Sequence, residues 1–184
     1  MTLPAGRNPW TTRASRVVYE NPWITVREDD VVRPDGGDGI YGVITTRVAT
    51  GVVAMTDDDR VVLVGQWRYP LEQYSWEIVE GGTDEGEEPM AAAARELREE
   101  AGFTAEHWEE LGGPVHLSNC FSAEEGRLYL ARDLVEVGDD PDGTEELARR
   151  LVPFDDVVAM VDDGTITDAM TVMAILRIAR RRGA

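Results

Sequence analysis

The chain has 184 residues, of which 36 are acidic and 18 basic, and its formal net charge is −18. This length is enough for one domain with a hydrophobic core. The acidic balance argues against nonspecific binding to nucleic acid or to anionic membranes, because both require a basic surface. The single cysteine excludes an internal disulfide. No apolar run is long enough to span a bilayer, and the N-terminus lacks the apolar core of a signal peptide, so we expect a cytoplasmic protein.

The first part of the chain is predicted to form strands after a flexible start. We expect residues 1–15 to be flexible. Apolar clusters in residues 16–33 and the β-branched run at 41–46 indicate strands, and the sequence PDGGDG between them is typical of a turn. We therefore assign residues 16–47 to N-terminal strands within a single domain that covers 16–184.

The next two apolar segments, residues 48–55 and 60–67, are predicted to form a β-hairpin. Asp57, Asp58 and Asp59 lie between them. Such a triplet resembles a metal site, but Asp is also favoured in hairpin turns because its side chain bonds to the nearby backbone. The turn is the interpretation we prefer.

Aromatic and basic residues follow this segment directly, in the order Gln66, Trp67, Arg68, Tyr69. Arg68 is a candidate for bidentate pairing with a phosphate, and Trp67 or Tyr69 for stacking on a base. The alternative is that Trp67 belongs to the core and that Arg68 forms a surface salt bridge, since buried aromatic side chains mostly serve packing.

Residues 81–103 contain a loop followed by a helix. Pro89 suits the first turn of a helix, residues 90–101 are rich in good helix formers, and Gly102 stands where a left-handed cap is expected. Gly81 and Gly82 are expected to let the preceding loop turn tightly and approach a ligand.

The helix is predicted to carry carboxylates on one side and apolar residues on another. Glu96, Glu99 and Glu100 are three or four residues apart, a spacing that brings side chains together. Crowded carboxylates repel each other unless cations lie among them, and Mg²⁺ prefers oxygen ligands that it often shares with phosphates. Arg95, four residues before Glu99, is expected to hold that carboxylate in place. A separate apolar face, formed by Ala93, Leu97 and Ala101, is expected to dock on a sheet.

This segment resembles the signature of the Nudix hydrolases, which cleave nucleoside diphosphates linked to another group. The signature is long and specific, and every fixed position matches. Those positions are Gly81, Glu87, Arg95, Glu96, Leu97, Glu99, Glu100, Gly102 and Phe103. An ordinary solvated acidic helix would rarely reproduce all of them at the right spacing.

Gln66-Trp67-Arg68 is followed by a Trp/Glu-rich strand and then by this signature, which we call the Nudix box. This order resembles the branch of the family that acts on ADP-ribose and nucleotide sugars, over roughly residues 23–172. The resemblance implies an α/β fold, with a mixed sheet sandwiched between helices and preceded by additional N-terminal strands. It also implies a homodimer that those strands help to build, two or more Mg²⁺ ions (or Mn²⁺) as cofactors, and a small nucleotide as the substrate.

The resemblance also implies roles for individual residues. Glu96 and Glu100 are the main candidate metal ligands, with Glu99 and the carbonyl of Glu80 as further ones. Glu87 is expected to support the loop or an outer metal site. The candidate catalytic residues are Glu124, Glu99 and Arg95, with Glu124 as the general base; the neighbouring Glu125 is an alternative base. The candidate substrate-binding residues are Arg68, Trp67, Gly81 and Gly82.

The final segments are predicted to form a helix at residues 155–161, ended by Gly164, and a last helix at 169–181, capped by Asp168. Three arginines at its end, Arg180 to Arg182, are expected to be solvated near the negative helix terminus. The resemblance also suggests that Glu145 and Glu146 lie near the mouth of the active site.

The expected reaction is metal-dependent hydrolysis of the pyrophosphate bond of a nucleoside diphosphate sugar, which yields a nucleoside monophosphate and a sugar phosphate. Ser118 and Asn119 stand where ADP-ribose enzymes often carry a proline, so other sugars such as GDP-mannose remain candidates. The alternatives are a Nudix enzyme that hydrolyses nucleoside triphosphates, a non-catalytic domain that senses ADP-ribose, and a protein that binds partners through its acidic surface.

Overall fold

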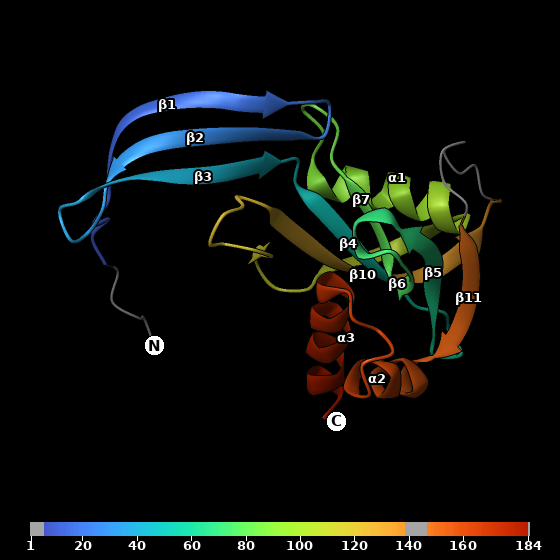
Figure 1. Cartoon of the computed structure of the whole chain (residues 1–184). Coiled ribbons are helices and arrows are strands. Elements are labelled where there is room, and N and C mark those ends of the chain that lie inside the picture. The colour runs from blue at the N-terminus through green and yellow to red at the C-terminus, as the bar shows by residue number, and fades with distance from the viewer. Residues whose placement is uncertain (1–5, 139–146, 184) are drawn as a thin grey trace. The chain divides into compact units, whose positions relative to one another are not determined.

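The computed structural model describes residues 6–138 and 147–183, and Figure 1 shows its elements. Glu145 and Glu146 lie outside the described residues. The helices are α1 (Pro89–Ala101), α2 (Phe154–Asp162), α3 (Ala169–Arg182) and the short 3₁₀ turn η1 (Tyr69–Leu71). The strands are β1 (Thr11–Glu20), β2 (Ile24–Val32), β3 (Asp38–Thr46), β4 (Ala49–Ala54), β5 (Arg60–Arg68), β6 (Gln73–Glu77), β7 (Val79–Gly82), β8 (Phe103–Glu110), β9 (Val115–His116), β10 (Glu125–Glu136) and β11 (Ala148–Pro153).

The chain divides into two compact units. The smaller unit comprises residues 1–47 and 118–124, and the larger unit comprises residues 48–117 and 125–184. The prediction of a single domain over 16–184, with 16–47 as a dimerisation element, stays a prediction.

The smaller unit is an antiparallel sheet in the order β1-β2-β3. Its first strand begins at Thr11 and pairs with β2, so residues 11–15 are part of this sheet. The prediction that residues 1–15 are flexible stays a prediction. The loop 118–124 is attached to β3: the Ile44 N–H donates to the Phe121 carbonyl at 2.8 Å, and the Ala123 N–H donates to the Ile44 carbonyl at 2.8 Å. This loop therefore belongs to the N-terminal sheet, although it is far from it in sequence.

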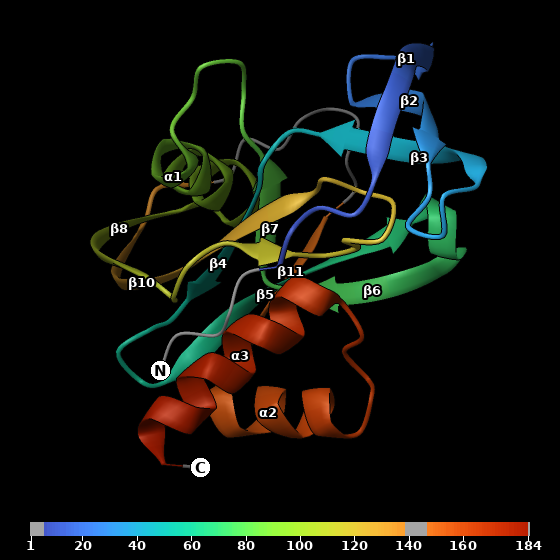
Figure 2. The same cartoon turned by 90° about the vertical axis from the view of Figure 1, so that its left-hand side faces the viewer.

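The larger unit contains two sheets. In one, the strands are ordered β7-β4-β10-β8, with β9 also paired to β10, and the other has the order β11-β5-β6. The β4–β10 pair is parallel and the remaining pairs are antiparallel, so the sheet is mixed as expected. In Figures 1 and 2, α1 lies on one side of these strands and α2 and α3 lie on the other.

The core has one apolar layer on each side of the sheets. Alternate residues of a strand point to opposite faces. In β4, Val53 packs toward α2 and α3, whereas Val52 packs toward α1 with Leu97. All three side chains are fully buried, and burial of a side chain of this size stabilises the fold by about 1.5–3 kcal/mol. The larger unit thus folds as an α/β/α sandwich, which confirms the predicted fold class.

The predicted hairpin of residues 48–55 and 60–67 is wrong. Both strands exist, but β4 pairs with β7 and β10, whereas β5 pairs with β6 and β11. A single bridge between Met55 and Val61 joins them at the turn. Both strands are buried on both faces, and a run of apolar residues does not reveal which strand lies next to it.

The aspartates between β4 and β5 form the predicted turn. Asp59 has a φ of 64°, a conformation that Asp tolerates better than most residues. Its carboxylate accepts two hydrogen bonds from Arg182, each of 2.7 Å, and Asp58 pairs with Arg60 at 3.0 Å. Arg182 is also stacked over the Phe154 ring, 4.1 Å from its centre. The residue is exposed, as predicted for this end of the helix, but its guanidinium is held by these contacts.

The predicted helix ends are confirmed. Pro89 occupies the first turn of α1, and Gly102 ends it with a φ of 70° and an N–H bonded to the Arg98 carbonyl at 3.1 Å. Asp168 caps α3 by accepting the Thr171 N–H at 2.6 Å. None of the helices in the part of the chain that the structure describes has both the length and the apolar composition needed to cross a membrane.

Candidate active site

The glutamates of α1 lie beside strand β7, as their spacing predicts. Glu100 is only 5% exposed, and its carboxylate accepts the backbone N–H of Glu80 at 3.2 Å. Glu96 and Glu99 are half-buried on the same helix. The carboxylates therefore stand against the strand that leads into the loop rather than in open solvent.

Arg95 is the centre of what we call the box cluster, formed by Arg95 and the carboxylates of Glu87, Glu96, Glu99 and Glu100. Its guanidinium binds both carboxylate oxygens of Glu87, at 3.1 and 3.0 Å. It also donates to Glu96 at 2.7 Å and to Glu99 at 3.1 Å, so the predicted Arg95–Glu99 pair is confirmed. These carboxylates, that of Glu87 first, raise the pKa of the Arg95 guanidinium above its ordinary value.

Glu87 ties the loop to the helix. Besides its two bonds from Arg95, its carboxylate accepts the backbone N–H of Asp84 at 2.8 Å. These hydrogen bonds lower the pKa of the Glu87 carboxyl, with that from Arg95 contributing most. Arg95 also reaches the Gly82 carbonyl, at 2.9 Å. The loop-supporting role that we considered for Glu87 fits these contacts.

Gly81 is required for space rather than for a turn. It lies in strand β7, and a Cβ at this position would overlap the Glu96 carboxylate, whereas a Cβ at Gly82 would meet nothing within 4 Å. The prediction that these two glycines make a tight turn is wrong, since the left-handed residue of the loop is Gly86, with a φ of 78°. The absence of a side chain at Gly81 lets Glu96 lie against the backbone next to Glu80.

A buried polar network that the sequence did not reveal lies beneath Glu80. The Thr171 hydroxyl accepts the Ile78 N–H at 3.0 Å and donates to the Glu80 carboxylate at 3.4 Å. Thr171 is fully buried in the first turn of α3. A signal was available, because Thr171 is a polar residue beside Met170 on the otherwise apolar face of that helix.

The Glu80 carboxyl group lies near the carboxylates of Asp168 and Glu77 and near the Arg68 guanidinium. Its loss of solvent on burial, followed by the charge of Asp168, raises its pKa well above the ordinary value. Asp168 was predicted only as the cap of α3; the fold also brings it to this network. A cation at the neighbouring oxygens would favour the ionised form instead.

Arg68 pairs with a buried carboxylate. Glu77 is 3% exposed, and both of its oxygens lie 3.0 Å from the Arg68 Nε. Burial alone would lower the pKa of Arg68, but the Glu77 carboxylate outweighs it and raises that pKa. Trp67 is 60% exposed, so the alternative that it is a core residue is wrong. The roles of Arg68 and Trp67 in binding substrate stay predictions.

The oxygen atoms of the box cluster are of the kind that Mg²⁺ prefers. In the described part of the chain, no three or more Asp, Glu, His or Cys side chains are already arranged to hold a metal ion. Glu96 and Glu99 are held instead by Arg95. The carboxylate oxygens of Glu96, Glu99 and Glu100 are suitable ligands for a divalent cation. Gly81 allows the Glu96 carboxylate to lie close to the backbone of β7.

The two candidate bases belong to different units. Glu124 lies in the smaller unit, where its N–H is bonded to the Ser122 hydroxyl at 2.9 Å. Glu125 begins β10 in the larger unit, and its carboxylate accepts a hydrogen bond from Arg127 at 2.7 Å. The assignment of the general base to Glu124 stays a prediction.

Comparison with known families identifies both parts of the chain. Residues 45–171 match the model of the NUDIX domain. The chain belongs to the Nudix family. Residues 10–44, which contain β1 and β2 and most of β3, match the model described as "Nucleoside diphosphate sugar hydrolase N-terminal domain". The chain is accordingly a Nudix hydrolase, and enzymes of this family generally act with divalent metal ions.

Two curated relatives match about nine tenths of the chain. The chain is 31% identical to the ADP-ribose pyrophosphatase of Bacillus subtilis over 166 residues, which cover 89% of each protein. It is 33% identical to the ADP-ribose pyrophosphatase of Mycobacterium tuberculosis over 173 residues, which cover 91% of this chain and 82% of the relative. A crystal structure of an ADP compounds hydrolase superposes with a TM-score of 0.84 at 23% identity and covers 96% of both chains. This last similarity supports the Nudix fold.

Proposed function

We propose that the protein hydrolyses the pyrophosphate bond of ADP-ribose or of another nucleoside diphosphate sugar, with release of a nucleoside monophosphate and a sugar phosphate. The observation that carries this proposal is the complete box cluster on a chain whose residues 10–44 match the N-terminal domain of nucleoside diphosphate sugar hydrolases. The two ADP-ribose pyrophosphatases support an ADP-sugar as the substrate.

In this proposal, Glu96, Glu99, Glu100 and the carbonyl of Glu80 hold two or more divalent cations, most suitably Mg²⁺ and alternatively Mn²⁺. When bound, such cations neutralise the charge of the diphosphate and lower the pKa of a bound water. Arg95 keeps the carboxylates of Glu96 and Glu99 in place, because one guanidinium nitrogen donates to both.

The remaining candidate residues bind the substrate or move the proton. Gly82 presents open backbone, so the diphosphate can approach it closely, and Gly81 contributes by leaving room for the Glu96 carboxylate. We assign to Arg68, whose guanidinium is held by Glu77, the binding of the diphosphate, and to the exposed ring of Trp67 stacking on the base. We assign to Glu124 the role of taking the proton from the attacking water.

We further propose that the protein is a homodimer whose second copy packs on the N-terminal sheet. All residues of β1 are exposed, among them Val17, Val18 and Tyr19, and this strand is an edge of its sheet. Exposed apolar side chains on an unprotected edge strand are a common sign of an interaction surface. Light scattering coupled to size-exclusion chromatography should give twice the mass of the chain; a monomer would reject this part of the proposal.

The reaction is tested with a panel of ADP-ribose, GDP-mannose, ADP-glucose, UDP-glucose, NADH and dGTP, each with Mg²⁺ and then with EDTA. We expect Mg²⁺-dependent release of a nucleoside monophosphate from one diphosphate sugar, and none with EDTA. Cleavage of dGTP alone would show that the protein is a Nudix enzyme that hydrolyses nucleoside triphosphates. Tight ADP-ribose binding without turnover of any compound would reject the proposed hydrolase activity and favour a non-catalytic domain that senses ADP-ribose.

The assignment of the base is tested by comparing Glu124→Gln with Glu125→Gln. We expect the first variant to lose turnover by about a hundredfold, which is typical of the loss of a general base, and the second to stay close to the unmodified enzyme. The reverse order would assign the role to Glu125.

A further inference from the structure

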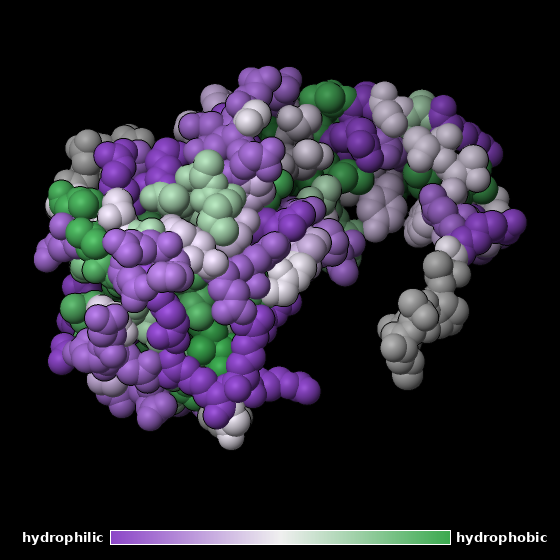
Figure 3. Space-filling model, turned by 180° about the vertical axis from the view of Figure 1, so that it is seen from behind, coloured by the Kyte–Doolittle hydropathy of each residue, from purple (hydrophilic) through white to green (hydrophobic). Residues whose placement is uncertain are grey.

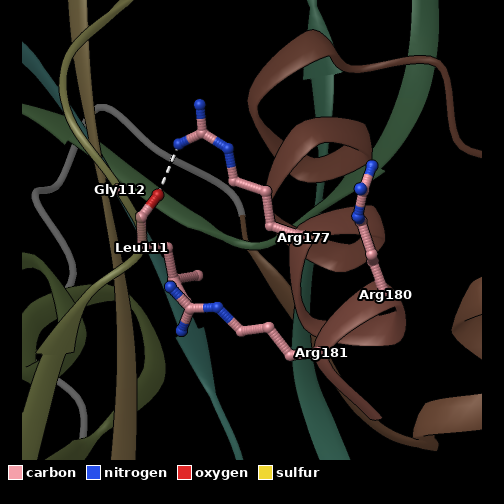
Figure 4. A pocket seen from close by; sticks show the side chains of 5 residues that line it. All are labelled: Leu111, Gly112, Arg177, Arg180 and Arg181. Atoms are coloured by element: carbon pink, nitrogen blue, oxygen red, sulfur yellow. Dashed lines mark hydrogen bonds between the residues drawn. The ribbon is translucent and has the colours of Figure 1, made fainter. Parts of the chain in front are cut away.

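A pocket on α3 is lined mainly by arginines. Its volume is about 450 Å³, and its walls are formed by Leu111, Gly112, Arg177, Arg180 and Arg181. We call it the arginine pocket (Figure 4). Its volume falls within the range of small-molecule sites.

The spacing of the arginines explains why all three line one pocket on α3. Arg177, Arg180 and Arg181 stand at positions i, i+3 and i+4 of one helix, so they share a face. Cations in the last turn of a helix are favoured by the negative end of its dipole, which accounts for Arg180 and Arg181. Arg177 precedes that turn, so the dipole alone does not explain its place in the pocket.

Arg177 is positioned by the turn after β8. Its guanidinium donates a hydrogen bond to the Leu111 carbonyl, drawn as a dashed line in Figure 4. Gly112 has a φ of 84°, and a Cβ there would lie 3.2 Å from a guanidinium nitrogen of Arg177. The positive φ favours glycine at this position, and a larger residue there would require the Arg177 guanidinium to shift by a few tenths of an ångström.

The positive charges of the pocket are only partly balanced. Arg181 pairs with the Glu109 carboxylate, whereas the partner of Arg177 is a neutral carbonyl. The Arg180 guanidinium makes no hydrogen bond or ion pair with any of the residues 6–138 and 147–183. Figure 3 shows a mostly hydrophilic face of this protein, whose net charge is −18. Arginines without acidic partners are unexpected on a chain of this charge.

We propose that the arginine pocket binds a small phosphorylated anion, at a site that is separate from the box cluster. A guanidinium presents its N–H groups as a planar fork that fits two phosphate oxygens. A phosphate or diphosphate has enough oxygens for more than one guanidinium, and its negative charge balances Arg177 and Arg180. None of the lining residues belongs to the box cluster, so occupation of this pocket does not require the catalytic metal.

The test is calorimetric titration of the full chain with inorganic pyrophosphate in EDTA at low ionic strength. EDTA removes the metal through which the box would bind a diphosphate. We expect one saturable site in the unmodified protein, and an affinity about tenfold lower in Arg180→Gln, the loss typical of one charge-assisted hydrogen bond. The Glu100→Gln variant should bind pyrophosphate with the same affinity as the unmodified protein. That result would show that the arginine pocket is separate from the catalytic site.

The matched control is Arg13→Gln, which removes the same charge from an exposed pair with Asp38 in the smaller unit. It should leave pyrophosphate binding unchanged. Absence of saturable binding to the unmodified protein at millimolar pyrophosphate would overturn the proposal. Equal weakening in Arg13→Gln and Arg180→Gln would also overturn it, since that result indicates general charge attraction. Circular dichroism melting curves establish that both variants are folded.

Discussion

The box cluster and the arginine pocket carry opposite charges and differ in how their side chains are held. In the box cluster, one arginine holds three carboxylates, and a fourth binds the backbone of β7. In the pocket, Arg180 makes no bond to a described side chain. A charged group that is already bonded contributes to the fold as well as to the chemistry. We therefore expect substitutions in the first region to alter activity, and stability as well where packing or a buried hydrogen bond is lost, whereas substitution of Arg180 in the second region should alter binding alone.

The largest effect is expected from Glu100→Gln, which should lower turnover by a hundredfold or more, since several kcal/mol of catalysis depend on the metal ligands. The Gln side chain retains an oxygen that can accept the Glu80 N–H, so the melting temperature should change little. Initial rates with Mg²⁺ on the substrate found in the panel, together with melting curves, check both parts. Turnover close to that of the unmodified enzyme would remove Glu100 from the metal site.

Gly81→Ala should lower turnover by about tenfold or more and destabilise the fold by about 1–3 kcal/mol, because Glu96 must move away from the added methyl group. Gly82→Ala is the matched control, since a Cβ there meets nothing within 4 Å. Rates and urea unfolding of the two variants measure the difference. Equal behaviour of the two would show that Gly81 does not serve to seat Glu96.

Thr171→Val should destabilise the fold by about 1–3 kcal/mol, because it keeps the shape of the side chain but leaves the buried Ile78 N–H without its acceptor. Thr171→Ser retains the hydroxyl and loses one methyl group, at a cost of about 1 kcal/mol. Urea unfolding ranks the two variants. A serine variant less stable than the valine variant would mean that packing, rather than hydrogen bonding, holds the network beneath Glu80.

The smallest effect is expected from Arg180→Gln. An exposed side chain without a described partner contributes little to stability, so we expect less than about 0.5 kcal/mol and an unchanged turnover number. Steady-state kinetics in the absence of added pyrophosphate, with urea unfolding, test this. A tenfold loss of turnover would connect the arginine pocket to the catalytic site and remove the contrast between the two regions.

The sequence was sufficient for features that depend on neighbouring residues. The bounds of α1 follow from Pro89 and Gly102, and its apolar face follows from the spacing of Leu97 and its neighbours. The pair of Arg95 with Glu99 likewise lies within one helical turn. These features could be predicted because the geometry of a helix fixes which side chains meet.

The tertiary structure decided which distant segments meet. Strands β4 and β5 are adjacent in the chain but have different partners, and Thr171 comes to lie against Ile78 and Glu80. The steric role of Gly81 and the meeting of Leu111 with Arg177 also depend on such contacts. Apolar periodicity shows which face of a strand or helix is buried but not what covers it, because the partner is chosen by packing across the whole domain.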